Sequence, residues 1–437
     1  MHVCVLGAGI VGLATAYVLR QQGLEVTVVD RATPGAGASG GNGAQLSYSY
    51  VQPLADPGIW RQLPQLLLSA DSPLKLQPQW DLQQWRWGLA FLRACNARTS
   101  ARSTAQLLQL AARSRIGFDA MLQDLALDCD FSRTGKLVVY RSAAALAAAG
   151  RQVALQQRLG SVQQVVSPQR CVELESALQH DQVRMVGAVY TPDECATDCL
   201  KVCVGLHAAL QQRGVKFVLG AEVLGVVRQG ARIRSVQTSA GAVQADQFVL
   251  ALGSSSPALA RQVGLQVPVY PLKGYSITLD IGDAPHSAPR VSVTDAARKV
   301  VFARIGHRLR VAGMAELVGQ DRRIPPARIQ SLLDSTRALF PQCVPGVDVQ
   351  PWTGMRPATP TGLPLMGRQA RGPENLLLNT GHGALGLTLA FGTAQVLADG
   401  LLGRDAVSAR PFRPPAAHTA SSRWPAGSPG GSPRARP

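Results

Sequence analysis

The glycines between residues 7 and 12 constrain the fold of this chain more than any other feature. Gly7, Gly9 and Gly12 form the pattern G-x-G-x-x-G between an apolar run, His2 to Leu6, and a stretch with helical spacing, Ile10 to Gln22. Such glycines permit a tight turn, let a pyrophosphate approach the helix N-terminus, and let the helix pack closely on the strand. The pattern therefore predicts a strand, a turn and a helix in that order.

A second strand is expected directly after this helix. Glu25 to Val29 is rich in β-branched residues and ends at Asp30, 18 residues after Gly12. A carboxylate at the end of that strand can accept hydrogen bonds from both hydroxyls of an adenosine ribose, and it disfavours NADP. The βαβ unit therefore predicts a bound dinucleotide.

The residues after Asp30 favour FAD over NAD. Gly, Ala and Ser dominate from Gly35 to Gly43, a segment that contains Ser39 and Asn42. Small residues allow the backbone to approach a bound ligand, whereas an NAD-binding unit normally continues with another helix and strand. A surface loop without a ligand remains the alternative interpretation of this segment.

Three later segments read as strands that extend the nucleotide-binding sheet. They are Lys216 to Leu219, Val223 to Val227, and Gln247 to Leu252, the last of which ends at Gly253.

A second glycine-rich turn lies near the C-terminus. Asn375 to Asn379 reads as a buried strand, Thr380 to Gly383 as a turn, and the pattern through Leu389 to Leu402 as a helix. The positive end of that helix suits the negative charge of a reduced flavin. His382 is expected to contact the flavin mainly through its backbone, and the alternative is that it only fits the turn. The residues predicted to bind FAD are Val5, Gly7, Gly9, Ile10, Val11, Gly12, Asp30, Arg31, Ser39, Asn42, Gly43, Val223, Gly253, Gly381, His382, Gly383, Leu385 and Gly386.

The sequence resembles the D-amino acid dehydrogenase branch of the glycine oxidase, sarcosine oxidase and D-amino acid oxidase superfamily. Beyond the N-terminal glycines, the resemblance rests on PDECATDC at 192–199, VYPLKGYSIT at 269–278, WTGMRPATPTGLPLMG at 352–367 and NTGHGALGLTLAFG at 379–392. The family's usual Asp in its T-P-D-G segment is Thr361 here, and the aromatic residue after the turn is Leu387.

The resemblance implies an α/β plus α+β fold with two domains. A Rossmann-like FAD-binding domain is expected from residues 1–56, 190–260 and 350–405. A substrate domain built on an antiparallel sheet is expected from 57–189 and 261–349, with most of the sheet in 261–349. The catalytic site is then expected between the two.

Three residues are predicted to act on the substrate. Arg356 lies in the G-x-R-P segment where related enzymes carry an arginine, and a guanidinium can hold an α-carboxylate by two charge-assisted hydrogen bonds. The alternative is that Arg356 caps or pairs with a loop. Lys273 and Tyr275 share one face of a predicted strand, so both could reach the cavity, or Lys273 could be solvated. Tyr48 and Tyr50 are also predicted to share a face, where they would either line the pocket or pack in the core.

The predicted reaction is oxidative deamination of a D-amino acid to a 2-oxo acid and ammonia, with hydride transfer from Cα to flavin N5. By resemblance, a quinone or another respiratory carrier accepts the electrons. Oxygen is the alternative acceptor, and a non-catalytic FAD-binding subunit of an electron-transfer complex is the alternative of another class.

The charge of the chain suggests where it resides. The net charge is +17, and the Pro-, Gly- and Ser-rich segment 406–437 carries five arginines and no acid, which predicts a disordered basic tail. No nucleic-acid motif organises the remaining charge. We expect a cytoplasmic protein with peripheral contact at the inner face of the bacterial plasma membrane.

Two other clusters could form sites. Cys195, Cys199 and Cys203 invite a metal interpretation, but on a helix the outer two sulfurs lie too far apart to share one ion, so core packing and free thiols are expected. Trp80 to Phe91 reads as an amphipathic helix that belongs either to the core or to a membrane-facing surface.

Overall fold

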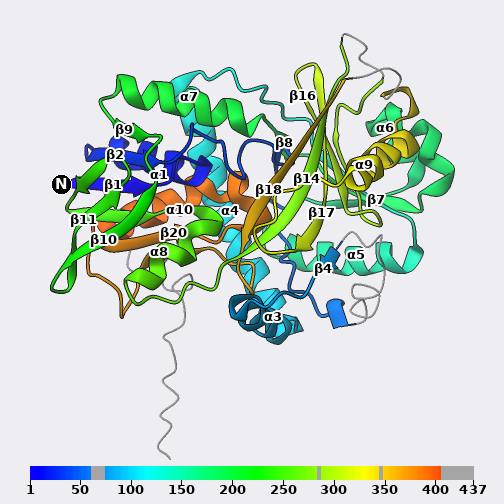
Figure 1. The fold of residues 1–437 in the computed structure, drawn as a ribbon. Coiled ribbons are helices and arrows are strands. Elements are labelled where there is room, and N and C mark those ends of the chain that lie inside the picture. Colours follow the sequence, from blue (N-terminus) through cyan, green and yellow to red (C-terminus); the bar gives the residue numbers. More distant parts are fainter. Residues whose placement is uncertain (61–73, 283–286, 344–347, 405–437) are drawn as a thin grey trace, which may run out of the picture.

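The computed structural model describes residues 1–60, 74–282, 287–343 and 348–404. Two large sheets lie side by side with helices packed around them (Figure 1). The predicted tail, 406–437, lies outside the described residues. The predicted fold class, α/β plus α+β with a Rossmann-like layer and a second layer built on an antiparallel sheet, is confirmed, although two strand pairs of the second sheet are parallel.

The nucleotide-binding sheet has six strands. In spatial order they are β19 (Leu365–Arg368), β20 (Leu376–Thr380), β13 (Gln247–Leu250), β1 (His2–Leu6), β2 (Glu25–Asp30) and β9 (Lys216–Leu219). All neighbouring pairs are parallel except β19 with β20. The strands predicted near 2–6, 25–30, 216–219, 247–252 and 375–379 all belong to this sheet.

Apolar helices cover this sheet because its buried strands need a nonpolar layer on each face. They are α1 (Ile10–Gln21), α4 (Ala97–Leu125), α7 (Cys199–Gln212) and α10 (Gly386–Leu401), with α8 (Ser256–Gln262) beside β13. The segment Gly383–Leu401 has the length and apolar composition of a membrane span, but it packs against α1 and α4 and is 61% buried. We therefore interpret it as a core helix.

Residues 223–229 do not extend the nucleotide-binding sheet, contrary to the prediction. β10 (Val223–Gln229), β11 (Arg232–Thr238) and β12 (Gly241–Gln244) form a separate antiparallel sheet. β10 turns back at Gly230, which has φ 60°, and pairs with β11. Because the hairpin satisfies the β10 backbone locally, β9 stays at the edge of the larger sheet.

The second large sheet has nine strands. Along its path they are β18 (Val349–Ala358), β14 (Tyr270–Asp280), β17 (Arg308–Leu317), β16 (Val300–Ile305), β15 (Ser292–Asp295), β5 (Lys136–Tyr140), β7 (Gly187–Thr191) and β6 (Gln164–Val166), while β4 (Leu74–Leu76) pairs with β17. The sheet is mixed, because β15 with β5 and β17 with β4 are parallel.

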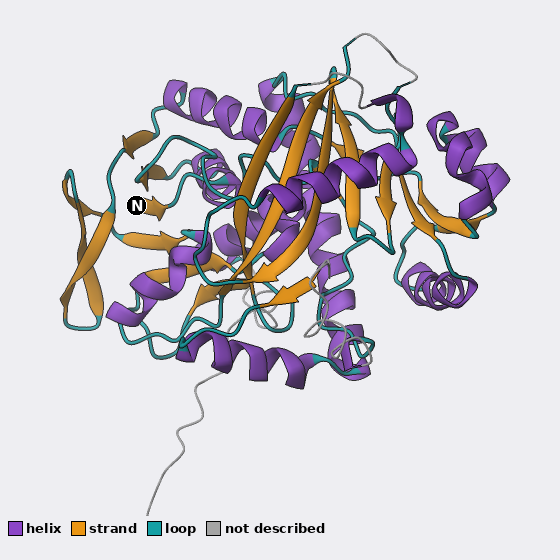
Figure 2. Ribbon diagram, turned by 45° about the vertical axis from the view of Figure 1, so that its right-hand side comes forward, coloured by secondary structure: helices purple, strands orange, loops and turns teal. Residues whose placement is uncertain are grey.

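One face of the nine-stranded sheet is covered by α9 (Pro326–Leu339), which crosses it (Figure 2). Three strands come from 136–191 and one, β18, from a segment predicted to belong to the FAD-binding domain. The domain boundaries themselves stay a prediction. The remaining elements are β3 (Gln45–Leu46), β8 (Cys195–Ala196), α3 (Leu82–Ala94), α5 (Ala143–Gln157), α6 (Pro168–Leu174) and the 3₁₀ turns η1 (Ser176–Arg184), η2 (Gly253–Ser255), η3 (Pro341–Cys343) and η4 (Gly383–Leu385).

Candidate active site

A cavity of about 770 Å³ is lined by residues of both large sheets. Its walls come from the β1–α1 turn, the end of β2, the glycine-rich segment 36–45, strands β14, β17 and β18, and the entry to α10. All the residues predicted to bind FAD line this cavity except Val5, Gly12 and Gly381. The two distant glycine-rich turns therefore converge on one space.

The β1–α1 turn leaves room for a ligand. Gly7 has φ 117°, and a Cβ on Gly12 would lie 1.8 Å from the Gly7 carbonyl oxygen, so Gly12 supports the turn without lining the cavity. Gly9 caps α1 with no side-chain hydrogen bond, and the first turn holds no acid. This helix end thus presents its positive dipole to the cavity, which fits a pyrophosphate.

Asp30 lies where the ribose of the dinucleotide is expected. Its Oδ2 accepts a hydrogen bond of 2.7 Å from the Ala8 amide, and its Oδ1 accepts one of 2.9 Å from the Ala32 amide. These bonds fix the carboxylate while its remaining lone pairs stay able to accept from ribose hydroxyls. Arg31, beside it, lies 3.9 Å from Glu222 across the cavity rim.

The glycine-rich segment is held by both layers. The Gly35 amide donates to the Ala8 carbonyl at 2.9 Å, and the Ser276 hydroxyl donates to the Gly41 carbonyl at 2.7 Å. A Cβ on Gly41 would lie 2.4 Å from Trp352, so the indole packs directly on the backbone.

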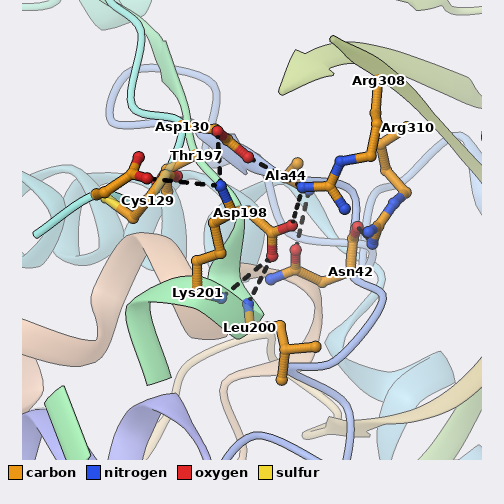
Figure 3. A network of polar contacts seen from close by, with 11 residues as sticks. Asn42, Ala44, Cys129, Asp130, Thr197, Asp198, Leu200, Lys201, Arg308 and Arg310 are labelled. Atoms are coloured by element: carbon orange, nitrogen blue, oxygen red, sulfur yellow. Dashed lines mark hydrogen bonds and ion pairs between the residues drawn. The ribbon is translucent and has the colours of Figure 1, made fainter. Parts of the chain in front are cut away.

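A polar network anchors the end of this segment (Figure 3). Arg310 donates to the Asn42 carbonyl at 3.0 Å. On the same strand, Arg308 lies 2.9 Å from Asp130 and 2.8 Å from Asp198, the N-cap of α7. The network joins the nine-stranded sheet to the nucleotide-binding layer, so Asn42 is positioned by contacts that only tertiary structure creates.

The second turn closes the other end of the cavity. Gly381 has φ 82°, and its position leaves no room for a Cβ, which would lie 2.6 Å from Thr359. The buried His382 ring lies 3.1 Å from the Thr393 hydroxyl, and burial lowers the pKa of His382 to about 3, so the ring is neutral near pH 7. Neither η4 nor α10 has a side-chain cap or an acid in its first turn. This end therefore suits an electron-rich flavin edge.

Arg356 presents a guanidinium to the cavity from β18. One nitrogen, Nη1, donates to the Met314 carbonyl at 2.8 Å. Within the described residues Arg356 forms no ion pair, and burial lowers its pKa to about 10, which leaves it charged near pH 7. A partly buried cation that lines a cavity without an acidic partner is costly, so the arrangement suits a carboxylate supplied by a ligand.

The carbonyl that holds Arg356 comes from an irregular part of β17. The pairing of β14 with β17 shifts register opposite Lys273 and Tyr275, and Met314 adopts φ 63°. A non-glycine residue in this region is uncommon and is held by its surroundings. The bulge therefore directs the Met314 carbonyl toward the guanidinium.

Lys273 and Tyr275 share a face, as predicted, but their polar groups point into other contacts. The Tyr275 hydroxyl donates to Glu316 at 2.6 Å, and its ring packs in the cluster that includes Leu332 of α9. Lys273 donates to the Arg323 carbonyl at 2.6 Å and does not line the cavity. Tyr275 nevertheless lines the cavity, next to Gly274, so of the two predicted residues the structure brings Tyr275 to the site and leaves Lys273 outside it.

Lys136 lines the cavity without any signal in the sequence, at the start of the apolar strand β5. Trp352, the first residue of the family segment 352–367, lines it from β18. Tyr48 and Tyr50 separate: Tyr48 is in the main core, and Tyr50 lines the cavity. A single lysine before an apolar strand is usually solvated, so only the fold identifies Lys136 as a cavity residue.

The cysteines and the tryptophan-rich helix lie outside the cavity. All eight cysteines are buried free thiols, and no group of His, Cys, Asp and Glu among the residues that the structure describes is arranged to hold a metal. The tryptophan-rich helix, α3, begins at Leu82. Cys195 lies in β8, and the helix that carries the other two cysteines of the cluster, α7, begins only at Cys199. Trp87 of α3 is buried, while Trp80 is fully exposed and Trp85 is 52% exposed.

The closely similar curated proteins share one name. The chain is 48% identical over 425 residues to "D-amino acid dehydrogenase 2" of Ralstonia nicotianae, which spans 94% of this chain and 99% of that protein. It is 45% identical over 401 residues to "D-amino acid dehydrogenase 2" of Pseudomonas aeruginosa, over 91% of this chain and 94% of that one.

Solved structures share the fold at lower identity. Glycine oxidase from Geobacillus kaustophilus superposes with a TM-score of 0.75 at 21% identity, over 94% of this chain and 97% of that one. L-proline dehydrogenase from P. horikoshii gives a TM-score of 0.72 at 15% identity, over 94% and 96%. Residues 2–400 match the family described as "DAO: FAD dependent oxidoreductase". With a cavity whose turns, ribose-side carboxylate and helix N-termini fit FAD, this chain belongs to the FAD-dependent oxidoreductase family.

Proposed function

We propose that this enzyme oxidises D-amino acids to 2-oxo acids and ammonia. The observation that carries the proposal is the guanidinium of Arg356, which faces the cavity without an acidic partner in the described chain. An α-amino acid offers a carboxylate of matching charge and planar shape. The names of the two relatives support a D-amino acid as the substrate.

The protein's contribution is mainly orientation. When bound, FAD supplies the acceptor for the hydride that leaves Cα. Arg356 holds the α-carboxylate, and its bond to the Met314 carbonyl limits how far the guanidinium can turn. The free amine of the substrate drives hydride departure with its own lone pair, so positioning accounts for most of the rate gain. The imino acid product then hydrolyses in water to the 2-oxo acid and ammonia.

The proposal extends to a quinone or another respiratory carrier as the electron acceptor, at the inner face of the plasma membrane. Support comes from α3, where Leu82, Trp85 and Leu89 are exposed, and from the exposed Trp80 just before the N-cap of that helix. Arg86 and Arg93 are exposed on the same helix. Aromatic side chains next to arginines suit the interfacial region of an anionic bilayer.

Anaerobic flavin reduction tests the proposal. The purified yellow protein is mixed with D-alanine, other D- and L-amino acids, glycine, sarcosine and proline, and the loss of flavin absorbance is followed. We expect D-amino acids to bleach the flavin fastest, and a quinone analogue to reoxidise it faster than air. Rapid peroxide formation would instead identify an oxidase, and no bleaching by any amine would favour a non-catalytic FAD-binding subunit.

A further inference from the structure

A second cation is built into the cavity wall. Lys136 opens β5, its side chain is 2% exposed, and it lines the same cavity as Arg356. Its Nζ donates to the Ser47 hydroxyl at 3.0 Å and lies 4.3 Å from the centre of the Tyr50 ring. An ammonium has three donors, and Ser47 is the one acceptor recorded for Lys136 among the described residues. Donor capacity is therefore left toward the cavity.

The positive charge of Lys136 is opposed by the buried carboxylate of Glu194, without direct contact between them. Burial lowers the pKa of Lys136 to about 8, and the charge of Glu194 opposes that shift. Glu194 is buried behind the same turn, where it accepts from the Ser49 amide at 2.7 Å. Within the described chain Glu194 forms no ion pair with Lys136, and the two are linked through the Ser47 hydroxyl. This compensates the ammonium only in part, so it can still bind a negative or strongly accepting group.

Lys136 and Arg356 occupy the same face of the nine-stranded sheet at a distance. Val138 and Val301 both pair with Thr294, so they lie on the same face of the sheet. Val301 is on the cavity side, where it lies under Gly43. Lys136 is two residues before Val138 and therefore points to that side as well. Arg356 reaches as far as β17, and β5 is the third strand beyond it. Three strand spacings are about 14 Å. Lys136 is in register with Arg310, four residues along β17 from Met314, which adds about 13 Å along the strands and makes the separation roughly 19 Å. This exceeds the separation of an α-carboxylate from its own amine.

We propose that Lys136 is a specificity residue that binds the side-chain end of the substrate while Arg356 binds its α-carboxylate. The substrates it favours are D-amino acids whose side chain ends in a carboxylate, with D-glutamate as the probe, and it disfavours D-lysine and D-arginine. The inference rests on the proposed function. The flexible lysine and arginine stems bridge part of the span, and a short side chain bridges the rest.

Kinetics with isosteric substrates tests this inference. In the unmodified enzyme, D-glutamate is expected to give a higher kcat/KM than D-glutamine. Lys136→Met is expected to lower kcat/KM for D-glutamate roughly 10- to 100-fold, the worth of one charge-assisted hydrogen bond, and to change that for D-alanine less than about threefold. Lys136→Arg retains the cation and is expected to restore part of the preference. Lys136→Glu is expected to favour D-lysine.

The matched control is Lys299→Met, because Lys299 lines the same cavity but has an exposed side chain. FAD content and the visible spectrum confirm that each variant is folded and loaded. A binding readout uses the shift of the flavin spectrum with glutarate and with butyrate. We expect Lys136→Met to weaken the binding of glutarate but not that of butyrate.

The outcomes separate the two hypotheses. Suppose that D-alanine reduces the flavin, but that Lys136→Met changes kcat/KM for D-glutamate and for D-alanine by the same factor. The specificity inference is then wrong and the proposed function stands. If no D-amino acid reduces the flavin, the proposed function fails, and the glutarate titration still decides whether Lys136 binds a distal carboxylate. Equal losses for glutarate and butyrate in Lys136→Met would assign the lysine a purely structural role.

Discussion

The guanidinium of Arg356 lies directly over Gly274 of the neighbouring strand. A Cβ placed on residue 274 would come within 2.4 Å of the Arg356 Cζ, and Gly274 pairs with Gly354 across the two strands. Gly274 thus leaves the space in which an arginine from β18 can extend over β14 to the Met314 carbonyl, while Gly354 leaves the space that the Trp352 indole fills. The proposed position of the substrate's carboxylate on Arg356 therefore depends on the glycine at 274.

Gly274→Ala is expected to displace Arg356 while leaving the cofactor site intact. The added methyl group overlaps the guanidinium, and an error of about 1 Å in substrate position can cost on the order of 100-fold in rate. Anaerobic flavin reduction by D-alanine measures the loss, and FAD content should not change. Gly150→Ala serves as the control, because its Cβ would make an ordinary contact of 3.7 Å. Unchanged reduction kinetics in Gly274→Ala would contradict the placement.

Arg356→Lys is expected to lower kcat/KM by roughly 100- to 1,000-fold despite retaining a positive charge. A lysine loses the planar pair of donors that matches a carboxylate, and each charge-assisted hydrogen bond contributes about 1.5–3 kcal/mol. Stopped-flow reduction across a range of D-alanine concentrations separates weaker binding from slower hydride loss. A variant with native kinetics would show that Arg356 only holds Met314.

Gly12→Ala is expected to yield protein with little FAD. Its Cβ would lie 1.8 Å from the Gly7 carbonyl oxygen, so the turn that approaches the pyrophosphate must open. Flavin absorbance relative to protein absorbance, and titration of the purified variant with FAD, measure the effect. Gly400→Ala is the control, because nothing lies within 4 Å of its added Cβ. Full flavin content in Gly12→Ala would remove the steric argument.

The preference for D-glutamate over D-glutamine is expected to weaken as the pH rises above about 8. Burial lowers the pKa of Lys136 from 10.5 to about 8, so its charge is present below that pH and is lost above it. Because both substrates titrate alike at the α-amine, the ratio of their kcat/KM values isolates Lys136. Glu194 and the Tyr50 ring are the groups that face it. The ratio should be flat with pH in Lys136→Met, and a pH-independent ratio in the unmodified enzyme would falsify this assignment.

The exposed face of α3 is expected to bind anionic membranes. Trp80→Ser combined with Trp85→Ser should lower the affinity for phosphatidylglycerol vesicles roughly tenfold, because large apolar side chains leave the interface. Vesicle cosedimentation measures the affinity, and flavin reduction by D-alanine should be unaffected. Ile116→Ser is the control, since Ile116 is 73% exposed on α4. Equal binding by all three proteins would remove the support for a membrane-facing α3.

Local chemistry in the sequence determined the cofactor end of this protein. The β1–α1–β2 unit follows from spacing and sterics within about thirty residues, because only glycine fits at Gly12 and a carboxylate at Asp30 ends the second strand. The family segment around Arg356 likewise identified an arginine that lines the cavity. Such features depend on neighbours along the chain, so pattern and composition are sufficient to predict them.

Only the tertiary structure decided which faces and which distant residues meet. Alternation placed Lys273 and Tyr275 together, but only Tyr275 of the two lines the cavity, and its hydroxyl is held by Glu316. The bulge at Met314, and the shared wall of Lys136 and Arg356 across several strands, arise from pairing between segments far apart in sequence. Strand order and the choice of buried face are set by the free energy of the whole chain, so they cannot be predicted from any local stretch of sequence.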